Sequence, residues 1–328
     1  MSGDISSARD KIGILAVVGP TASGKSALAL ELARRLDGEI ISCDSMQIYR
    51  RMDIGTAKPT ASELASVRHH MIDIVEPDAP FSCADYVSLA DAAIRDCAER
   101  GRLPIVCGGT GLYLDALLRG SELADVGGDE DIRRELWAFA DREGAEALWQ
   151  ELLRIDPESA QATHPNNIKR VIRAIEIFRI GGVPKSELDR RSREGGTRFD
   201  ATVIGLRRSD RESLYRRIDE RVDSMISEGL VEETRALMAD GVFEKNKTAA
   251  QAIGYKELIG YIEGRESLEA AVERLKCATR RYAKRQMTWF SAKDYVRWIE
   301  LSGDGGENGK TEKTFEEIVN CALSLFSK

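Results

Sequence analysis

The amino-acid sequence predicts an α/β protein with a doubly wound parallel sheet, an inserted helical domain and a helical C-terminal region. First, short apolar runs alternate with helix-periodic segments over the first 120 residues, which is typical of β-α units. Second, these runs end at glycines or at an acidic residue, as strands do where a parallel sheet opens onto a ligand. Third, a strand-poor helical segment lies between Gly127-Gly128 and Gly195-Gly196.

A strand, a tight loop and a helix are expected at the start, in IGILAVVGPTASGKS (residues 12–26). The pattern G-x-x-x-x-G-K-[ST] is that of a phosphate-binding loop, whose glycines let backbone amides point at an anion on the helix N-terminus. Ser26 is the candidate ligand of Mg²⁺, the one cofactor that we expect. The sheet is therefore expected to be P-loop NTPase-like, although the loop does not say which polyphosphate it binds. Its residues are Gly19, Pro20, Thr21, Ala22, Ser23, Gly24, Lys25 and Ser26.

Composition indicates an ordinary globular protein of 328 residues, with 42% hydrophobic and 31% charged residues. We find no secretory signal and no membrane-spanning run, so a cytoplasmic protein without membrane association is expected. Six cysteines lack any C-x-x-C pair, and buried, reduced thiols are expected. The net charge is −7, but residues 1–150 carry −9 and residues 151–300 carry +4, so the second half is the place to look for a polyanionic partner.

Two further apolar runs predict strands, and each is followed by candidate functional residues. EIISC (39–43) is followed by Asp44, a candidate proton acceptor or metal ligand whose alternative role is to cap a turn. LPIVC (103–107) runs into glycines around Thr110, where the backbone can approach a ligand. Nothing there resembles the acidic end of a Walker B strand, which argues against a standard NTPase.

We expect five parts in the chain. They are 1–126 (first part of the core), 127–196 (helical insertion), 197–300 (second part of the core with basic C-terminal helices), 301–314 (flexible linker) and 315–328 (tail helix). In the insertion, the helix near 168–178 carries three cations close together, Lys169, Arg170 and Arg173. A nucleic-acid clamp would need such a basic face, but a basic face of this kind is more often simply exposed to solvent. The adjacent histidines of RHHMID (68–73) do not have the spacing of a metal site.

The second half carries two basic helices after an expected strand at 202–206. A helix over 210–239 places Arg217 and Arg221 one turn apart, which suits a diphosphate, a nucleic-acid backbone or simple surface pairing. A helix over 268–290 presents Leu275, Tyr282 and Trp289 among its core residues. The strongest candidate nucleic-acid patch lies on its other side and comprises Arg280, Arg281, Lys284 and Arg285.

The motifs in this order resemble one family, the tRNA dimethylallyltransferases, also called tRNA isopentenyltransferases. The resemblance covers nearly the whole chain except its two ends. It is carried by GPTASGKS (19–26), DSMQIYRRMDIGTAKP (44–59), RHHMID (68–73), GGTGLY (108–113), DPESAQATHPNNIKRVIRAIEIF (156–178), RIDERVDSMISEGLVEE (217–233), AIGYKE (252–257) and ATRRYAKRQMTWF (278–290). No zinc-finger spacing is present, so the chain resembles the bacterial form.

The resemblance implies transfer of a dimethylallyl group from dimethylallyl diphosphate to N6 of the adenosine immediately 3′ of a tRNA anticodon. It implies that Thr21 to Ser26 hold the diphosphate with Lys25 as main cation and Arg221 as helper, and that Asp44 accepts the N6 proton. Thr110 would lie by the target nucleotide or the donor. The other tRNA-contacting residues implied are Ser45, Met46, Gln47, Arg133, Lys169, Arg170, Val171, Ile172, Arg173, Gln251, Ala252, Ile253, Gly254, Tyr255 and Lys256.

Two other functions are compatible with the residues taken by themselves. A P-loop small-molecule kinase would use the loop for a nucleotide, but it does not explain the basic second half. A non-catalytic P-loop RNA-binding protein would not need Asp44. The partners that we expect are a tRNA anticodon stem-loop and dimethylallyl diphosphate, and the protein is expected to be a monomer.

Overall fold

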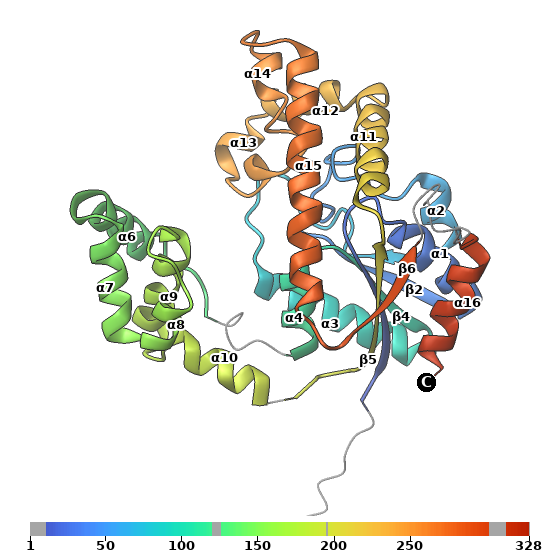
Figure 1. The fold of residues 1–328 in the computed structure, drawn as a ribbon, viewed down its shortest axis with the longest axis horizontal. Coiled ribbons are helices and arrows are strands. Elements are labelled where there is room, and N and C mark those ends of the chain that lie inside the picture. The colour runs from blue at the N-terminus through green and yellow to red at the C-terminus, as the bar shows by residue number, and fades with distance from the viewer. Residues whose placement is uncertain (1–10, 120–125, 195, 302–312, 328) are drawn as a thin grey trace, which may run out of the picture. The chain divides into compact units, whose positions relative to one another are not determined.

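A computed structural model describes residues 11–119, 126–194, 196–301 and 313–327, and it contains one six-stranded parallel sheet in the order β3-β2-β4-β1-β5-β6 (Figure 1). Consecutive strands are separated by helices, so the predicted α/β fold with a parallel sheet is confirmed. The strands are β1 (Gly13–Val18), β2 (Gly38–Cys43), β3 (His69–His70), β4 (Leu103–Gly108), β5 (Asp200–Arg208) and β6 (Val296–Leu301).

The described chain divides into two compact units. The first comprises 1–82, 88–114 and 199–328, and the second comprises 83–87 and 115–198. The expected insertion, 127–196, lies within the second unit, which begins earlier in the chain. The helices are α1 (Lys25–Arg35), α2 (Ala61–Ser66), α3 (Cys83–Glu99), α4 (Gly111–Arg119), α6 (Glu130–Glu143), α7 (Ala145–Ile155), α8 (Pro157–Gln161), α9 (Ile168–Gly181), α10 (Lys185–Glu194), α11 (Arg211–Ser227), α12 (Leu230–Ala239), α13 (Val242–Lys245), η1 (Ala249–Gln251), α14 (Ile259–Ile262), α15 (Leu268–Ser291) and α16 (Phe315–Phe326).

The strand register brings the carboxyl ends of three strands to one edge of the sheet. Val18 of β1 pairs with Gly108 of β4, and Gly108 pairs with Cys43 of β2. A Cβ on Gly108 would lie 2.0 Å from the Cys43 carbonyl oxygen, so only glycine allows this close approach. The loops that follow these strands, which carry the phosphate-binding motif, Asp44 and Thr110, therefore meet at this edge.

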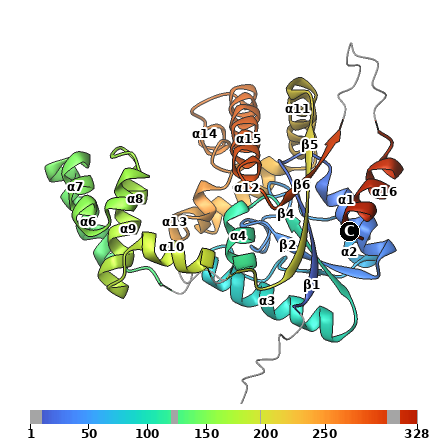
Figure 2. The ribbon, with the colours of Figure 1, turned by 60° about the horizontal axis from the view of Figure 1, so that its bottom comes forward.

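The tail helix α16 belongs to the core of the first unit. It packs with α1 on one face of the sheet, where Val319 and Ala322 are fully buried against apolar side chains of β1, β4, β5 and β6 (Figure 2). Thr314 and Glu317 form a capping box at its start. Figure 2 shows α3 on the opposite face of the sheet. The helix predicted for the tail from its amphipathic pattern thus covers part of one face of the sheet.

The second unit is a helical body with a core of its own. Apolar side chains of α6, α7 and α9 pack together, among them Leu136, Leu148, Val171 and Ile175. Their spacing of three and four residues along each helix puts them on one face, as the pattern predicts. No helix in the described part of the chain combines the length and the apolar character needed to cross a membrane.

Several expectations are corrected by the structure. The single helix expected over 210–239 is two helices, because Gly229 adopts a left-handed conformation (φ 105°) between α11 and α12. Strand β6 was not expected at all. All six cysteines are free as expected, but Cys83, Cys277 and Cys321 are partly exposed. Most of the expected linker, 302–312, lies outside the described residues, as does Gly195.

Candidate active site

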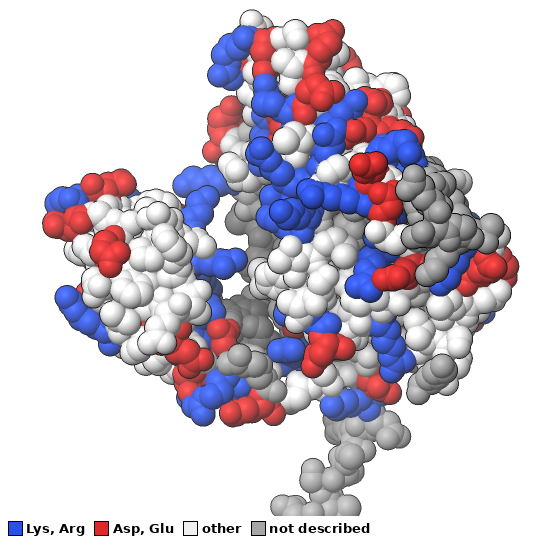
Figure 3. All heavy atoms as spheres, in the orientation of Figure 1, with Lys and Arg blue, Asp and Glu red and all other residues white. Residues whose placement is uncertain are grey.

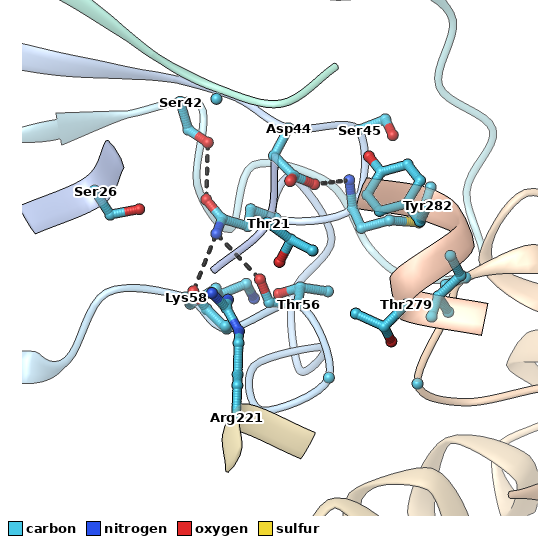
Figure 4. Close-up of a pocket in the computed structure, with 18 of the residues that line it drawn as sticks. Thr21, Ser26, Ser42, Asp44, Ser45, Thr56, Lys58, Arg221, Thr279 and Tyr282 are labelled. Carbon is cyan, nitrogen blue, oxygen red and sulfur yellow. Dashed lines mark hydrogen bonds between the residues drawn. The ribbon is translucent and has the colours of Figure 1, made fainter. Parts of the chain in front are cut away.

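A pocket of about 580 Å³ lies within the first unit, at the edge of the sheet where the strand ends meet (Figure 4). Its volume is typical of a small-molecule or cofactor site. Its wall combines the phosphate-binding loop, the segment after β2, the end of β4, helices α11 and α15, and residues 251–254 and 256. Elements far apart in the sequence thus converge on one cavity.

The phosphate-binding loop has the conformation that its glycines allow. Gly24 is left-handed (φ 92°) and caps α1, which begins at Lys25. A Cβ on Gly19 would lie 2.7 Å from the Leu206 carbonyl oxygen, so this turn also requires glycine. The amides of the first turn of α1 have no partner within the helix and are therefore available to an anion. Thr21, Lys25 and Ser26 line the pocket.

Two of the cations that line the pocket, Lys25 and Arg221, are partly buried and have no carboxylate partner in the described part of the chain. Among the described residues, neither Lys25 nor Arg221 of α11 forms a salt bridge; the Lys25 ammonium donates only to the Pro20 carbonyl oxygen, at 3.3 Å. Desolvation by surrounding protein atoms lowers the pKa of both groups, whereas the charge of Asp44, which forms no salt bridge with either, raises the pKa. Mutual repulsion of the two cations adds to the lowering for Lys25. An incoming anion would relieve this penalty.

Asp44 lies at the opposite side of the pocket from Arg221 (Figure 4). It directly follows β2, and its Oδ1 accepts a hydrogen bond of 2.9 Å from the Met46 amide, so the capping alternative is also realised. Thr110 Oγ1 accepts from the Ser45 amide at 3.1 Å, while the Thr110 amide donates to the Cys43 carbonyl at 3.1 Å. The predicted pair Asp44 and Thr110 is thus brought together across two strands.

Of the three residues after Asp44, Gln47 is committed to the protein itself. Its Oε1 accepts from Ser42 Oγ at 2.8 Å, and its Nε2 donates to the Thr56 and Ala57 carbonyls, at 3.1 Å each. Gln47 therefore holds the 56–57 wall of the pocket and is not free to read a base through its amide. Ser45 and Met46 line the pocket.

The loop 53–58, which contributes residues 55–58 to the pocket wall, is held by groups that the sequence patterns do not indicate. The carboxylate of Glu233 accepts hydrogen bonds from the amides of residues 53, 54 and 55 and from the Tyr255 hydroxyl, at 2.7–3.1 Å. Lys58, almost fully buried, donates to the Tyr49 carbonyl and pairs with Asp53 and Asp73. The motif DIGTAKP contains these groups, but its long-range partner Glu233 could not be read from it.

Helix α15 lines the pocket with a polar face that includes Thr279, Tyr282, Arg285 and Gln286 (Figure 4). The helical periodicity predicts Tyr282 in the core, but its ring lies beside Asp44 and Ser45 in the pocket. Desolvation first, and the charge of Asp44 second, raise the pKa of its phenol, which keeps it protonated. The Arg285 guanidinium lies over the Tyr282 ring, 5.5 Å from its centroid.

The predicted basic patch on α15 divides into two kinds of residue. Arg281 and Lys284 are exposed, and Figure 3 shows Lys and Arg side chains gathered over the part of the core where Figure 1 places α15. Arg280 instead pairs with Asp219 of α11 and lies over the Tyr215 ring at 5.8 Å. Arg280 therefore joins two helices, and its charge is already compensated.

In the helical unit the same division appears. Lys169 and Arg170 are exposed, but Arg133 and Arg173 both pair with Glu176, which is fully buried. The side chains of Val171 and Ile172, expected among the RNA-contacting residues, are 0% and 3% exposed and belong to the core of the unit. These two are set aside as side-chain contacts because they are not at the surface.

The segment 251–256 also separates into pocket and core residues. Gln251, Ile253, Gly254 and Lys256 line the pocket, as does Ala252, which is nearly buried. Tyr255 is fully buried, and a Cβ on Gly55 would lie 2.5 Å from its ring, so Tyr255 packs beneath the 53–55 loop.

The residues of the pocket fit a hard divalent cation only together with a ligand. Ser26 offers a hydroxyl oxygen at the pocket wall, and Mg²⁺ prefers oxygen ligands and keeps several waters. One protein hydroxyl does not make a complete site, but one hydroxyl with diphosphate oxygens and waters does. The one metal-like cluster among the described residues, Glu39, His70 and Cys97, lies elsewhere, and Arg100 already binds both Glu39 oxygens.

Known proteins show extensive similarity to the chain. The family described as IPP transferase matches residues 47–293, and the one described as isopentenyl transferase matches residues 12–78. A tRNA dimethylallyltransferase of Geobacillus thermodenitrificans is 48% identical over 306 residues, covering 93% of this chain and 96% of that protein. The crystal structure of tRNA isopentenylpyrophosphate transferase from Bacillus halodurans is 45% identical, has a TM-score of 0.68 and covers 97% of each chain. Crystal structures of a eukaryotic dimethylallyltransferase acting on tRNA give 29% identity and a TM-score of 0.76, over 88% of this chain and 74% of that one.

Proposed function

Because the chain belongs to the family of tRNA dimethylallyltransferases, it is a prenyltransferase that modifies tRNA, and we propose that it moves the dimethylallyl group of dimethylallyl diphosphate onto N6 of the adenosine immediately 3′ of the anticodon. The observation that carries this proposal is one pocket that holds a carboxylate, Asp44, and two partly buried cations without a salt-bridge partner among the described residues, Lys25 and Arg221. The comparisons give no support to the small-molecule kinase alternative.

The cationic side of the pocket suits a diphosphate. Lys25, Arg221 and the amides at the start of α1 would bind its oxygens, and the charge that the pocket leaves uncompensated would stabilise the leaving group. Mg²⁺, held by Ser26 and the diphosphate, would neutralise further negative charge. An allylic diphosphate ionises readily, so stabilisation of the departing diphosphate is the main catalytic requirement.

Asp44 is the proposed proton acceptor. In the reaction the bond between the allylic carbon and the diphosphate oxygen breaks, and diphosphate leaves with the electron pair. The carbon forms a bond to N6, and the N6 proton passes to the Asp44 carboxylate. An aromatic amine is a weak nucleophile, so a carboxylate at hydrogen-bonding distance favours attack as positive charge develops on nitrogen.

The acceptor adenosine must leave its stack to reach this pocket. We propose that the extruded base is surrounded by Ser45, Met46 and the pocket-lining residues of the 251–256 segment, with Thr110 holding Ser45. Exposed cations such as Arg281 and Lys284 would bind the stem-loop backbone. Lys169 and Arg170 of the helical unit are the corresponding candidates in the insertion. We further expect a monomer that works in the cytoplasm, where unmodified tRNA is encountered.

The proposal is tested by incubating the protein with Mg²⁺, labelled dimethylallyl diphosphate and an unmodified anticodon stem-loop, with and without ATP. Label in an adenosine of the RNA, independent of ATP, is the expected result. Consumption of ATP with a small acceptor and no labelled RNA would instead support a kinase.

The role of Asp44 is tested by Asp44→Asn, which keeps the shape of the side chain. We expect kcat to fall about 100- to 10,000-fold, with stem-loop and diphosphate affinities nearly unchanged. The matched control is Asp240→Asn, which changes an exposed carboxylate paired with Arg51 and should leave kcat unchanged. Full turnover in Asp44→Asn would remove Asp44 from the mechanism.

A further inference from the structure

A buried glutamine on α15 connects the phosphate-binding loop to the loop after β4. Gln286 is 5% exposed, and its Oε1 accepts a hydrogen bond of 2.8 Å from the Thr21 amide. Its Nε2 donates to the Gly109 carbonyl at 3.0 Å. Each half of the side-chain amide thus meets a backbone group of the complementary kind, which fixes its orientation.

The Gln286 side chain fits closely against the loop after β4. A Cβ on Gly109 would lie 2.0 Å from Gln286 Nε2, so glycine at 109 makes room for this side chain. Thr21 and Gly109 belong to segments 265 and 177 residues away from Gln286, and no regular secondary structure joins them to α15. The two hydrogen bonds therefore hold three separate segments in register.

We propose that Gln286 is a positioning residue that sets the shape of the phosphate-binding loop. With its amide taken by Gln286, Thr21 contributes no amide to a diphosphate, and the cradle is formed by the later amides of the loop and by Lys25. The expectation that all of Thr21 to Ser26 bind the diphosphate is narrowed accordingly. This inference rests on the proposed function of the pocket as a diphosphate site.

The same helix carries a second, exposed face. Gln286, Tyr282 and Thr279 are spaced by four and three residues and face the pocket, whereas Arg281 and Lys284 are exposed. Loss of Gln286 should therefore affect the phosphate loop and leave the exposed cations in place. If only diphosphate binding is weakened, Gln286 positions the phosphate-binding loop. A general structural role would weaken stem-loop binding as well.

The test compares the full chain with Gln286→Met, which has a similar volume but removes both hydrogen bonds. Affinity for inorganic diphosphate should fall about 10- to 100-fold, since the Thr21 amide and the buried Gly109 carbonyl lose the side chain that holds the loop. Stem-loop affinity and its salt dependence should stay within about twofold of the wild type. The control is Thr288→Ala, an exposed position on the same helix, for which both affinities should be unchanged.

Unchanged diphosphate affinity in Gln286→Met would overturn the proposal, as would parallel loss of diphosphate and stem-loop binding. A double-mutant cycle keeps the test decisive. Gly109→Ala should displace Gln286 and weaken diphosphate binding, but it should add nothing once Gln286→Ala has made room. If the two substitutions instead weakened diphosphate binding independently, so that their fold-losses multiplied, the proposal would also be overturned. Diphosphate binding is measured without turnover, so failure of prenyl transfer in the wild type would count against the proposed function alone.

Discussion

Lys25 and Arg221 of the pocket differ from Arg133 and Arg173 of the helical unit in how their charge is compensated. Lys25 and Arg221 have no carboxylate partner among the described residues, and desolvation lowers the pKa of both. Arg133 is also partly buried, yet the carboxylates of Glu176 and Glu130 outweigh desolvation and raise its pKa. Arg173 shares Glu176 and also donates to the Val126 and Gly127 carbonyls.

Basic residues in a nucleic-acid-modifying enzyme therefore fall into two groups, according to whether a carboxylate of the protein already neutralises them. A compensated cation stabilises the fold, and binding RNA would require it to exchange partners. An uncompensated cation in a pocket destabilises the free protein and gains when an anion arrives. The sequence patterns of Lys169, Arg170 and Arg173 show no such division, whereas the structure does.

The largest expected effect comes from removing an uncompensated cation. Lys25→Met should weaken inorganic diphosphate binding about 1,000-fold, because a charge-assisted contact in a low-dielectric pocket is lost. It should also raise the thermal unfolding temperature of the free protein, because a desolvated charge is removed. The matched change Arg133→Met should do the reverse, with unchanged diphosphate affinity and lower stability. Calorimetric titration measures the diphosphate affinity of both variants, and thermal unfolding measures their stability. If both variants changed in the same direction in both measurements, Lys25 and Arg133 would not differ in how their charge is compensated.

Substitution of Glu176 removes the carboxylate that compensates the charges of Arg133 and Arg173. Glu176→Gln keeps the side-chain volume but leaves Arg133 and Arg173 without their buried carboxylate, which should cost about 3 kcal/mol in the stability of the helical unit. Hydrogen exchange should accelerate in α6 and α9 and stay unchanged in β1 and β5. The control Glu135→Gln removes an exposed partner of Arg179 and should have little effect. Slow exchange in α6 of Glu176→Gln would show that the pair adds no stability.

How far the sequence predicts this arrangement depends on the range of the interactions. The strand-loop-helix around Lys25, the strand ends at Asp44 and Thr110 and the amphipathic tail α16 are local patterns, and their elements were predicted correctly. The partners Glu233 and Gln286 lie about 180 or more residues from the segments they hold, so only the fold reveals them.

The elements that were missed have local causes. Strand β6 is the short run VRWIEL at the edge of the sheet, and its buried residues do not alternate regularly with exposed ones, so its periodicity is weak. The break at Gly229 lies within an otherwise helical pattern, where a single glycine does not by itself indicate an end. Tyr282 was assigned to the core because periodicity gives the face of a residue and cannot distinguish a core from a pocket.

A smaller effect is expected from pH. Since the pKa of Lys25 is lowered from its ordinary value of 10.5, the free protein loses this charge at a lower pH than an ordinary lysine does. Above that folded-state pKa, diphosphate affinity should fall about tenfold per pH unit relative to Lys25→Arg, which keeps its charge. The stability of the free protein should change in the opposite direction. The unfolded chain keeps the proton up to about 10.5, so stability rises with pH between the folded-state pKa and that value.

The comparison of Lys25 with Lys25→Arg is needed because diphosphate itself titrates at alkaline pH. The ratio of the two dissociation constants cancels that contribution. A constant ratio from neutral pH to pH 10 would mean that Lys25 titrates as an ordinary lysine, and the pocket would then not be a desolvated one.

The smallest expected effect is a difference in stem-loop binding between substitutions of Arg280 and Arg281 on α15. Arg281→Ala should weaken stem-loop binding about 3- to 10-fold and reduce the salt slope by about one, because an exposed charge no longer displaces a counterion. Arg280→Ala should leave the salt slope nearly unchanged, because Asp219 already neutralises that guanidinium, and should instead lower stability. Stem-loop titrations over a range of salt concentrations measure both variants. If the slope fell equally in both, pairing within the protein would not decide which cations bind RNA, and the division drawn between Lys25 and Arg133 would not extend to α15.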